Sequence, residues 1–341
     1  MGESRLLKPK ISMMISIFFT LMFFAWVQAQ CPEEDNIAPC KCVTPNGEVN
    51  VLCRGEIGLP RLTEVLMKTF CGEIIKKFEL IQSDIDYLPS NLFYKVIAKD
   101  IQVSFTNISH FTRAGISAFF GQERYLESLS MRRCHLVDGL QWQMIGDLQV
   151  LTYLDLSFND LSRIPKQWFK HPPPNLRSLT LKGNKIQALE SGAFYYMHKL
   201  LQLDVSENQI TNIMRDAFPW PGNNLLYLTL SYNNLATLPE DLFDEMLGLR
   251  RIYLDSNKLK TLPENVWSPV WGELEHLDLY GNNLTCGCDT YWVSELRPPT
   301  LLYGECYTYN LTQVKLSSLN ATHFEECVLW QTEDLETVLI F

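Results

Sequence analysis

Apolar and polar positions follow one pattern through most of the chain. In each copy, leucine or another apolar residue fills the first, fourth, sixth and eleventh positions, and in the regular copies asparagine fills the ninth. Six copies are regular, with successive asparagines 24 or 25 residues apart: Asn159, Asn184, Asn208, Asn233, Asn257 and Asn282. Six such segments in phase do not arise by chance, so the pattern predicts a chain of stacked structural repeats.

Three less regular copies precede these six. In LESLSMRRCHL (126–136), Cys134 takes the place of the asparagine. The two copies before it have Ser83 and Thr106 in that place, with their apolar residues at Ile75, Phe78, Leu80 and Ile85, and at Ala98, Ile101, Val103 and Ile108. The step from Thr106 to Cys134 is 28 residues, which indicates a small insertion around residues 109–125.

The alternation within each copy predicts a short strand, because successive side chains of a strand point to opposite faces. One copy cannot bury its apolar face alone, so neighbouring copies share a continuous core. The asparagine side chain is expected to bond to backbone groups at the turn that follows the strand. Core packing is also expected for the aromatic residue ten positions later: Phe93, Phe169, Phe194, Phe218, Phe243 and Trp267.

The motif L-x-x-L-x-L-x-x-N-x-L resembles the leucine-rich-repeat family over roughly residues 75–284. The resemblance implies an α/β solenoid with a curved parallel sheet on its concave side. A solenoid leaves an apolar end at each terminus, so a capping unit is expected at both ends. We therefore expect four segments: a signal peptide (1–29), an N-terminal cap (30–74), about nine repeats (75–284), and a C-terminal cap and tail (285–341).

The first segment has the features of a secretion signal. Arg5, Lys8 and Lys10 precede a nearly continuous apolar run at 11–27, and Val27-Gln28-Ala29 offers a cleavage site. The alternative is an uncleaved anchor helix, because a mostly apolar run of 17 residues nearly spans a bilayer. Cleavage is favoured, since Cys31 begins a new cysteine cluster directly afterwards. A secreted, extracellular product without a stable membrane anchor is therefore expected.

Cysteines behind a secretion signal are more often disulfide partners than metal ligands. Eight of the ten form two clusters, Cys31, Cys40, Cys42 and Cys53, then Cys286, Cys288, Cys306 and Cys327. Spacing alone permits three connectivities for each cluster. The resemblance to extracellular leucine-rich-repeat caps implies the pairs Cys286–Cys306 and Cys288–Cys327, and by analogy Cys31–Cys42 and Cys40–Cys53. A zinc site at Cys286-x-Cys288 is disfavoured because the spacing is short.

The two remaining cysteines have different expected states. Cys134, in an asparagine position, is expected to be a buried thiol. For Cys71 both alternatives stay open, a free thiol or a partner within the N-terminal cap. Four N-x-S/T glycosylation patterns occur in the sequence, at Asn107, Asn283, Asn310 and Asn320, and the expected secretion favours their use. Asn107 is expected to be partly hidden.

Charge narrows the possible partners. The formal net charge is −10, and it becomes −12 when the signal segment takes away three positive charges and one negative. An acidic chain argues against nucleic acid and against adhesion to anionic membranes. No Gly-rich phosphate loop or hydrolase motif occurs, and Asp155, Asp204 and Asp278 in one outward column are better explained as a solvated face. We therefore expect neither catalysis, nor a cofactor, nor a metal.

The concave face suggests protein binding instead, since Tyr and Arg are enriched among interface anchors. The candidate residues lie near the middle of the later repeats: Tyr227, Tyr232, Arg250, Arg251 and Tyr253, with Asp204 and Asp278 at the border. His276 is also outward, and a solvated surface role is the preferred interpretation for it. The expected function is a secreted, non-catalytic scaffold whose partner is a receptor, a matrix protein or a catalytic subunit.

The opening of the N-terminal cap, CPEEDNIAPCKC, is similar to secreted arthropod leucine-rich-repeat proteins. Among these it resembles the type named after the non-catalytic leucine-rich subunit of the luciferin monooxygenase of luminous shrimp. This resemblance implies an alternative function, that of an accessory subunit of a secreted enzyme.

Overall fold

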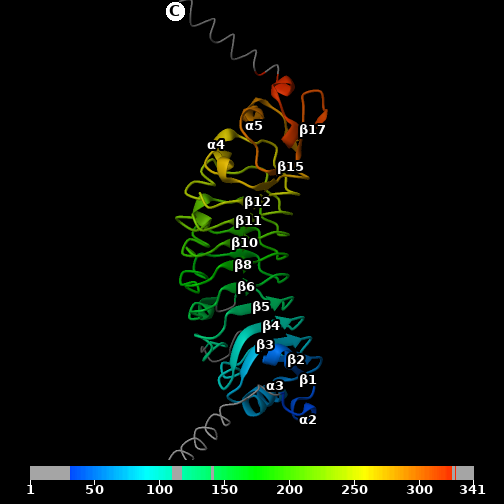
Figure 1. The fold of residues 1–341 in the computed structure, drawn as a ribbon, viewed down its shortest axis with the longest axis vertical. Coiled ribbons are helices and arrows are strands. Elements are labelled where there is room, and N and C mark those ends of the chain that lie inside the picture. Colours follow the sequence, from blue (N-terminus) through cyan, green and yellow to red (C-terminus); the bar gives the residue numbers. More distant parts are fainter. Residues whose placement is uncertain (1–30, 110–116, 140–141, 325–326, 328–341) are drawn as a thin grey trace, which may run out of the picture.

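Each of the nine repeats contributes one strand to a single sheet in the computed structural model, which describes residues 31–109, 117–139, 142–324 and 327. The sheet has twelve strands in the order β1-β2-β3-β4-β5-β6-β8-β10-β11-β12-β13-β15. All neighbours pair in parallel except β1 and β2. Figure 1 shows these strands stacked along the long axis, which is the arrangement of a leucine-rich-repeat solenoid.

The strands of the repeats differ in length along the stack. The first two have eight residues each, β3 (Ile74–Ile81) and β4 (Ile97–Ser104), and the third has five, β5 (Ser128–Arg132). The regular repeats contribute three residues each: β6 (Tyr153–Asp155), β8 (Ser178–Thr180), β10 (Gln202–Asp204), β11 (Tyr227–Thr229), β12 (Arg251–Tyr253) and β13 (His276–Asp278).

Both caps extend the sheet. The N-terminal cap supplies β1 (Cys40–Val43) and β2 (Val49–Arg54), and the C-terminal cap supplies β15 (Leu301–Tyr303). Two smaller sheets consist of β14 (Leu284–Thr285), β16 (Glu305–Tyr307) and β17 (Gln313–Lys315), and of β7 (Arg163–Ile164) and β9 (Ala188–Leu189).

Helices are short and lie outside the sheet. The α-helices are α2 (Glu34–Ile37), α3 (Leu59–Glu64), α4 (Glu264–Trp267) and α5 (Trp292–Glu295), and a π-helical turn spans Val65–Thr69. The 3-10 turns are Pro45–Gly47, Trp142–Ile145, Arg215–Ala217, Trp271–Glu273, Cys288–Thr290, Leu316–Ser318 and Ala321–Phe324. None of the helices in the described residues is both long and apolar enough to cross a bilayer. The expected signal segment lies outside the described residues.

One continuous apolar core runs through the stack, as the repeat pattern predicts. The leucines of each motif are buried, and the six aromatic residues that follow the motifs are at most 1% exposed. Two pairs of neighbouring rings in this aromatic row contact each other, Phe169–Phe194 and Phe243–Trp267, with centroids 6.1 and 5.1 Å apart. Each repeat therefore buries its apolar face only against its two neighbours.

The asparagine row bonds to the backbone of two successive repeats. Asn233 Oδ1 accepts a hydrogen bond from the Ile210 amide of the preceding repeat at 3.0 Å. Its Nδ2 donates to the carbonyls of Val205, Leu230 and Ser231 at 3.0, 3.0 and 3.2 Å. The same arrangement recurs at the other five asparagines, so the predicted structural role of this position is confirmed.

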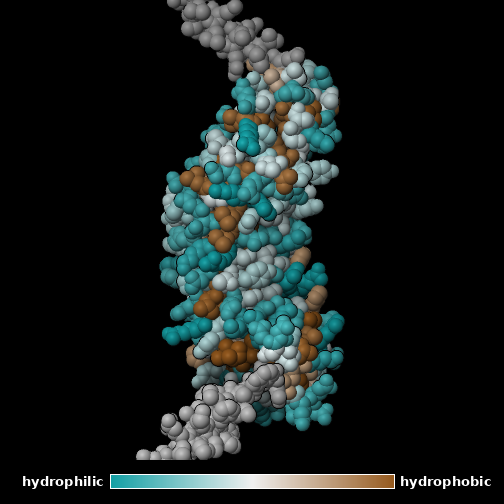
Figure 2. Space-filling model, viewed as in Figure 1, coloured by the Kyte–Doolittle hydropathy of each residue, from teal (hydrophilic) through white to brown (hydrophobic). Residues whose placement is uncertain are grey.

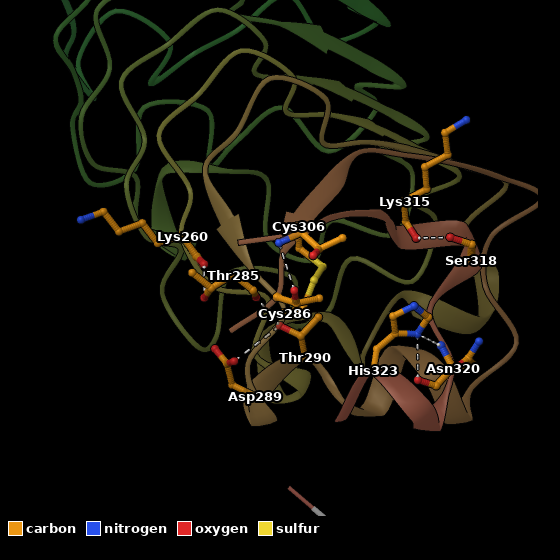
Figure 3. The surroundings of a disulfide bond; sticks show 12 residues. Lys260, Thr285, Cys286, Asp289, Thr290, Cys306, Lys315, Ser318, Asn320 and His323 are labelled. Atoms are coloured by element: carbon orange, nitrogen blue, oxygen red, sulfur yellow. Dashed lines mark hydrogen bonds between the residues drawn. A yellow bond between two sulfur atoms is a disulfide. The ribbon is translucent and has the colours of Figure 1, made fainter. Parts of the chain in front are cut away.

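Disulfides close both caps with the four pairs that the resemblance implies: Cys31–Cys42, Cys40–Cys53, Cys286–Cys306 and Cys288–Cys327. Around Cys286–Cys306, one hydrogen bond joins the cap to the repeat that carries Asn257, and a second lies within the cap (Figure 3). The hydroxyl of Thr285 donates to the Lys260 carbonyl at 3.1 Å, and the hydroxyl of Thr290 donates to the Thr285 carbonyl at 3.2 Å. The disulfides thus close the C-terminal cap on itself, and the Thr285 hydroxyl connects it to the repeats.

The two free cysteines lie in opposite environments. Cys71 is exposed and unpaired, which resolves the alternatives left open by the sequence, and Cys134 is buried as expected. The Cys134 thiol donates to the carbonyls of Val103 and Arg132, both at 3.4 Å, in the manner of an asparagine Nδ2. Burial raises the pKa of this thiol to about 12.

Alkylation of the native protein is expected to modify Cys71 and to leave Cys134 unmodified. Thiolate is the reactive form, and Cys134 remains a neutral thiol at every pH below its raised pKa of about 12. Mass spectrometry after treatment with iodoacetamide, in mildly alkaline buffer with and without denaturant, measures this. A Cys71→Ser variant is the control and should take up no label until it unfolds. Labelling of native Cys134 at the rate of Cys71 contradicts the prediction.

Candidate functional site

The outward side chains of the later strands form two columns on the concave face, set by the parallel register. In the first column Tyr227 is opposite Arg251, which is opposite His276. In the second column Thr229, Tyr253, Asp278 and Tyr303 follow one another. Residues about 25 positions apart in the sequence thus become direct neighbours, because each repeat advances the sheet by one strand.

Aromatic and basic side chains in these columns contact one another. The Arg251 guanidinium lies over the Tyr227 ring, with its Cζ 5.3 Å from the ring centroid. His276 lies between two tyrosines, with its ring centroid 4.7 Å from that of Tyr253 and 5.3 Å from that of Tyr303. We call these five residues the concave cluster: Tyr227, Arg251, Tyr253, His276 and Tyr303.

His276 is part of this cluster rather than a separate solvated residue. Its Nε2 is buried and has no hydrogen-bond partner within the described residues. Burial lowers the pKa of His276, the charge of Arg251 lowers it further, and the carboxylate of Asp278 opposes both. The imidazole is therefore held more strongly in its neutral form, which favours ring stacking over charge pairing at this point of the face.

The structure separates the other candidates from the cluster. Arg250 points to the turn before β12, where its Nη1 donates to the carbonyls of Leu247, Gly248 and Leu249 at 3.0–3.1 Å. Its Nη2 lies 3.1 Å from a carboxylate oxygen of Glu273. Because these contacts occupy the guanidinium within the chain, Arg250 stabilises a turn. Tyr232 is 58% exposed and lies in the turn after β11, outside both columns.

The two border carboxylates are partly engaged. Asp204 Oδ1 accepts a hydrogen bond from the Ser206 amide at 2.9 Å, and Asp278 Oδ1 accepts one from the Tyr280 amide at 3.0 Å. Asp155, earlier in the same column, is 4% exposed and lies 3.5 Å from the Arg132 guanidinium. The acidic column therefore supports the turns that follow the strands. Within the described residues, no group of three or more His, Cys, Asp or Glu side chains is placed to hold a metal ion.

Sequence reasoning missed Tyr303, because residues 301–303 lack the repeat motif. The signal that could have found it is the short apolar run Leu301-Leu302-Tyr303, which Gly304 follows and which is compatible with one more strand. All four candidate glycosylation residues are exposed: Asn107, Asn283, Asn310 and Asn320. The expectation that Asn107 is partly hidden is wrong, because its side chain lies in the turn beyond the sheet edge and not in the core.

Comparison with known proteins supports the repeat architecture. Leucine rich repeat family models match residues 150–171, 174–219 and 223–284. No curated protein matches the chain. Among solved structures, a chain in the octameric complex of Latrophilin 3, Unc5D and FLRT2, in which FLRT2 is marked as the LRR component, is 21% identical. The match has a TM-score of 0.54 and covers 75% of this chain and 83% of that one.

Two further matches involve longer proteins. A chain of the TLR13–ssRNA13 complex is 22% identical with a TM-score of 0.54, and the match covers 68% of this chain and 36% of that chain. A chain of the Toll–Spatzle complex of Drosophila is 20% identical with a TM-score of 0.53, over 69% of this chain and 34% of that one. This chain thus spans about a third of each. The three likenesses show the leucine-rich-repeat fold and leave the site to be argued from its own residues.

Proposed function

We propose that this leucine-rich-repeat solenoid is a secreted, non-catalytic protein that binds a protein partner through the concave cluster. The observation that carries the proposal is the contiguity of Tyr227, Arg251, Tyr253, His276 and Tyr303 across strands β11, β12, β13 and β15. Tyrosine and arginine supply large contact area at interface centres, and their clustering on one rigid sheet favours a preorganised interface.

Several observations support secretion and a protein partner. Four disulfides suit an oxidising compartment, and the four glycosylation candidates are exposed. The Latrophilin 3–Unc5D–FLRT2 and Toll–Spatzle structures are complexes between proteins, which favours the same kind of partner. One matched structure contains single-stranded RNA, but a net charge of −10 disfavours a polyanionic partner here.

The test uses the tagged protein purified from the medium of secreting cells, with its bound proteins identified by mass spectrometry. Affinity for the recovered partner is then measured for the triple variant Tyr227→Ala, Arg251→Ala, Tyr253→Ala. We expect a loss of roughly thirtyfold or more, since truncating one interface hot spot already costs about 2 kcal/mol.

The matched control is Arg163→Ala with Tyr196→Ala, which removes an exposed arginine and an exposed tyrosine from outside the twelve-stranded sheet. It should leave affinity unchanged, and both variants should keep the wild-type unfolding midpoint. Unchanged affinity of the triple variant contradicts the concave cluster as the site. A single stoichiometric enzyme chain as partner identifies the accessory-subunit function, whereas a receptor or matrix protein identifies a recognition module.

A further inference from the structure

A second group of side chains stands out in the turns that follow the strands of the earlier repeats. The residue directly before each asparagine position has a left-handed backbone, including Phe105, Arg133 and Phe158 with φ of 53°, 54° and 58°. Bulky residues rarely adopt this conformation, because it brings Cβ close to the backbone and costs on the order of 1 kcal/mol. Three bulky side chains are thus held side by side in consecutive turns, against the local preference of the backbone.

These three side chains form a ladder in which arginine lies between two rings. The Cζ of Arg133 is 5.2 Å from the Phe105 ring centroid and 5.0 Å from the Phe158 ring centroid. The next turn has Gly183, where an added Cβ would lie 2.5 Å from the Phe158 ring, so the glycine leaves room for that ring. Both rings thus lie within cation–π distance of the guanidinium, and its N–H groups bond to no described residue.

Arg133 differs from its charged neighbours because it makes no ion pair within the described residues. Arg132 lies 3.5 Å from Asp155, Glu79 lies 2.9 Å from Lys77, and Asp160 contacts both Lys185 and His135. The Arg133 side chain also donates no hydrogen bond to described residues. An exposed guanidinium that is oriented but unpaired, in a chain of net charge −10, is an unused anion-binding group.

The ladder separates two surface hollows. The first hollow, of about 320 Å³, lies over the sheet, and its lining includes Gln102, Ser130 and Arg132. The second, of about 450 Å³, lies on the other side of the ladder, and its lining includes Asn107 and His135. Phe105 and Arg133 border both hollows. The hydropathy view shows apolar side chains in separate patches on a largely hydrophilic face (Figure 2). An arginine between an exposed phenylalanine, Phe105, and a partly buried one, Phe158, is a small local anchor of the kind found in interfaces.

We propose that Phe105, Arg133 and Phe158 form a second protein-docking site, which takes a segment that presents one carboxylate between apolar side chains. The Arg133 edge receives the carboxylate in a two-pronged hydrogen bond, and the rings of Phe105 and Phe158 receive the flanking apolar groups. A sulfated polysaccharide fits less well, because it needs several unpaired cations and this site supplies one. The site is independent of the concave cluster, which lies on strands β11 to β15.

The experiment selects displayed random peptides on the wild-type chain, with soluble Arg133→Gln protein present as competitor. Enriched peptides are expected to contain Asp or Glu next to apolar residues. A synthetic enriched peptide, its amide counterpart (Glu→Gln or Asp→Asn) and a heparin fragment are then measured by fluorescence anisotropy. We expect Arg133→Gln to weaken peptide binding by about tenfold or more, since a charge-assisted hydrogen bond contributes about 1.5–3 kcal/mol.

Further variants separate positioning from charge. Arg133→Lys keeps the positive charge but loses the planar guanidinium, which can donate two parallel hydrogen bonds. It should therefore bind the peptide more weakly than the wild type and more tightly than Arg133→Gln. Phe158→Ala should weaken binding while Arg163→Gln, an exposed arginine elsewhere, should not. The concave triple variant should bind the peptide normally, which keeps the two proposals distinguishable. The inference is overturned if no peptide is enriched, or if the enriched peptides depend on Arg133 but lack a carboxylate. It is also overturned if Arg133→Gln binds the peptide with unchanged affinity, or if only the heparin fragment binds in an Arg133-dependent way.

Discussion

Replacing Asn233 by alanine is expected to lower the free energy of unfolding by about 2–4 kcal/mol, because it leaves several buried backbone groups without partners. The side chain is 6% exposed and bonds to four backbone groups in two repeats. Alanine can replace none of these bonds, and water has little access to the site. Denaturant unfolding followed by circular dichroism measures the change.

The neighbouring residue supplies the control for this prediction. Asn234 is less buried, so Asn234→Ala should change stability by less than about 0.5 kcal/mol. Asn233→Asp adds a pH test, since a carboxylate there would face three carbonyls and its folded-state pKa would be raised. Its stability should be highest below the unfolded-state pKa of about 3.9 and fall as pH rises through the raised value. A loss at Asn233→Ala no larger than at Asn234→Ala contradicts the structural role.

Replacing Phe243 by alanine is expected to cost about 3–5 kcal/mol, the usual loss for a buried aromatic side chain. The ring is fully buried and contacts Trp267 of the next repeat. Because each repeat packs only on its neighbours, the lesion weakens the coupling between the earlier repeats and the C-terminal cap. We expect thermal unfolding to become broader or to divide into two steps, which calorimetry can resolve.

Two further variants test whether the loss comes from the buried ring of Phe243. Phe243→Leu keeps most of the volume and should cost less than about 2 kcal/mol. Tyr309→Ala removes an aromatic ring that is 84% exposed and should leave the transition unchanged. A single sharp transition in Phe243→Ala at the wild-type temperature contradicts the expected coupling through the aromatic row.

The repeat core was predictable because its signals are local and periodic. Each kind of residue recurs at a fixed place in the motif: the leucines, the asparagine row and the aromatic row. The structural role of a position in one copy therefore predicts its role in the other copies. The four disulfide pairs followed from the resemblance to known caps, since spacing alone leaves three connectivities open in each cluster. The same spacing could not decide that Cys71 stays free, which depends on where the cap places it.

The candidate surface was only partly predictable. Tyr227, Arg251 and Tyr253 follow from strand alternation, and the structure brings them together. Arg250 precedes the strand at a variable position of the motif, and its long side chain turns to the nearby carbonyls, a choice of rotamer that the pattern does not encode. Tyr303 joins the cluster through the cap strand β15. The Phe105–Arg133–Phe158 ladder depends on left-handed turn geometry, which no residue-type preference indicates for Phe or Arg.

The reversed direction of β1 has a consequence for how copies of the molecule meet. A stack that ended in a parallel strand would offer the hydrogen-bonding pattern of its own interior, and another copy could add to it end to end. Here β1 runs antiparallel to β2, has four residues, and is joined to its partner by Cys40–Cys53 at directly opposed positions. The end strand therefore does not offer another copy the parallel register of the interior strands, which disfavours head-to-tail growth into fibres.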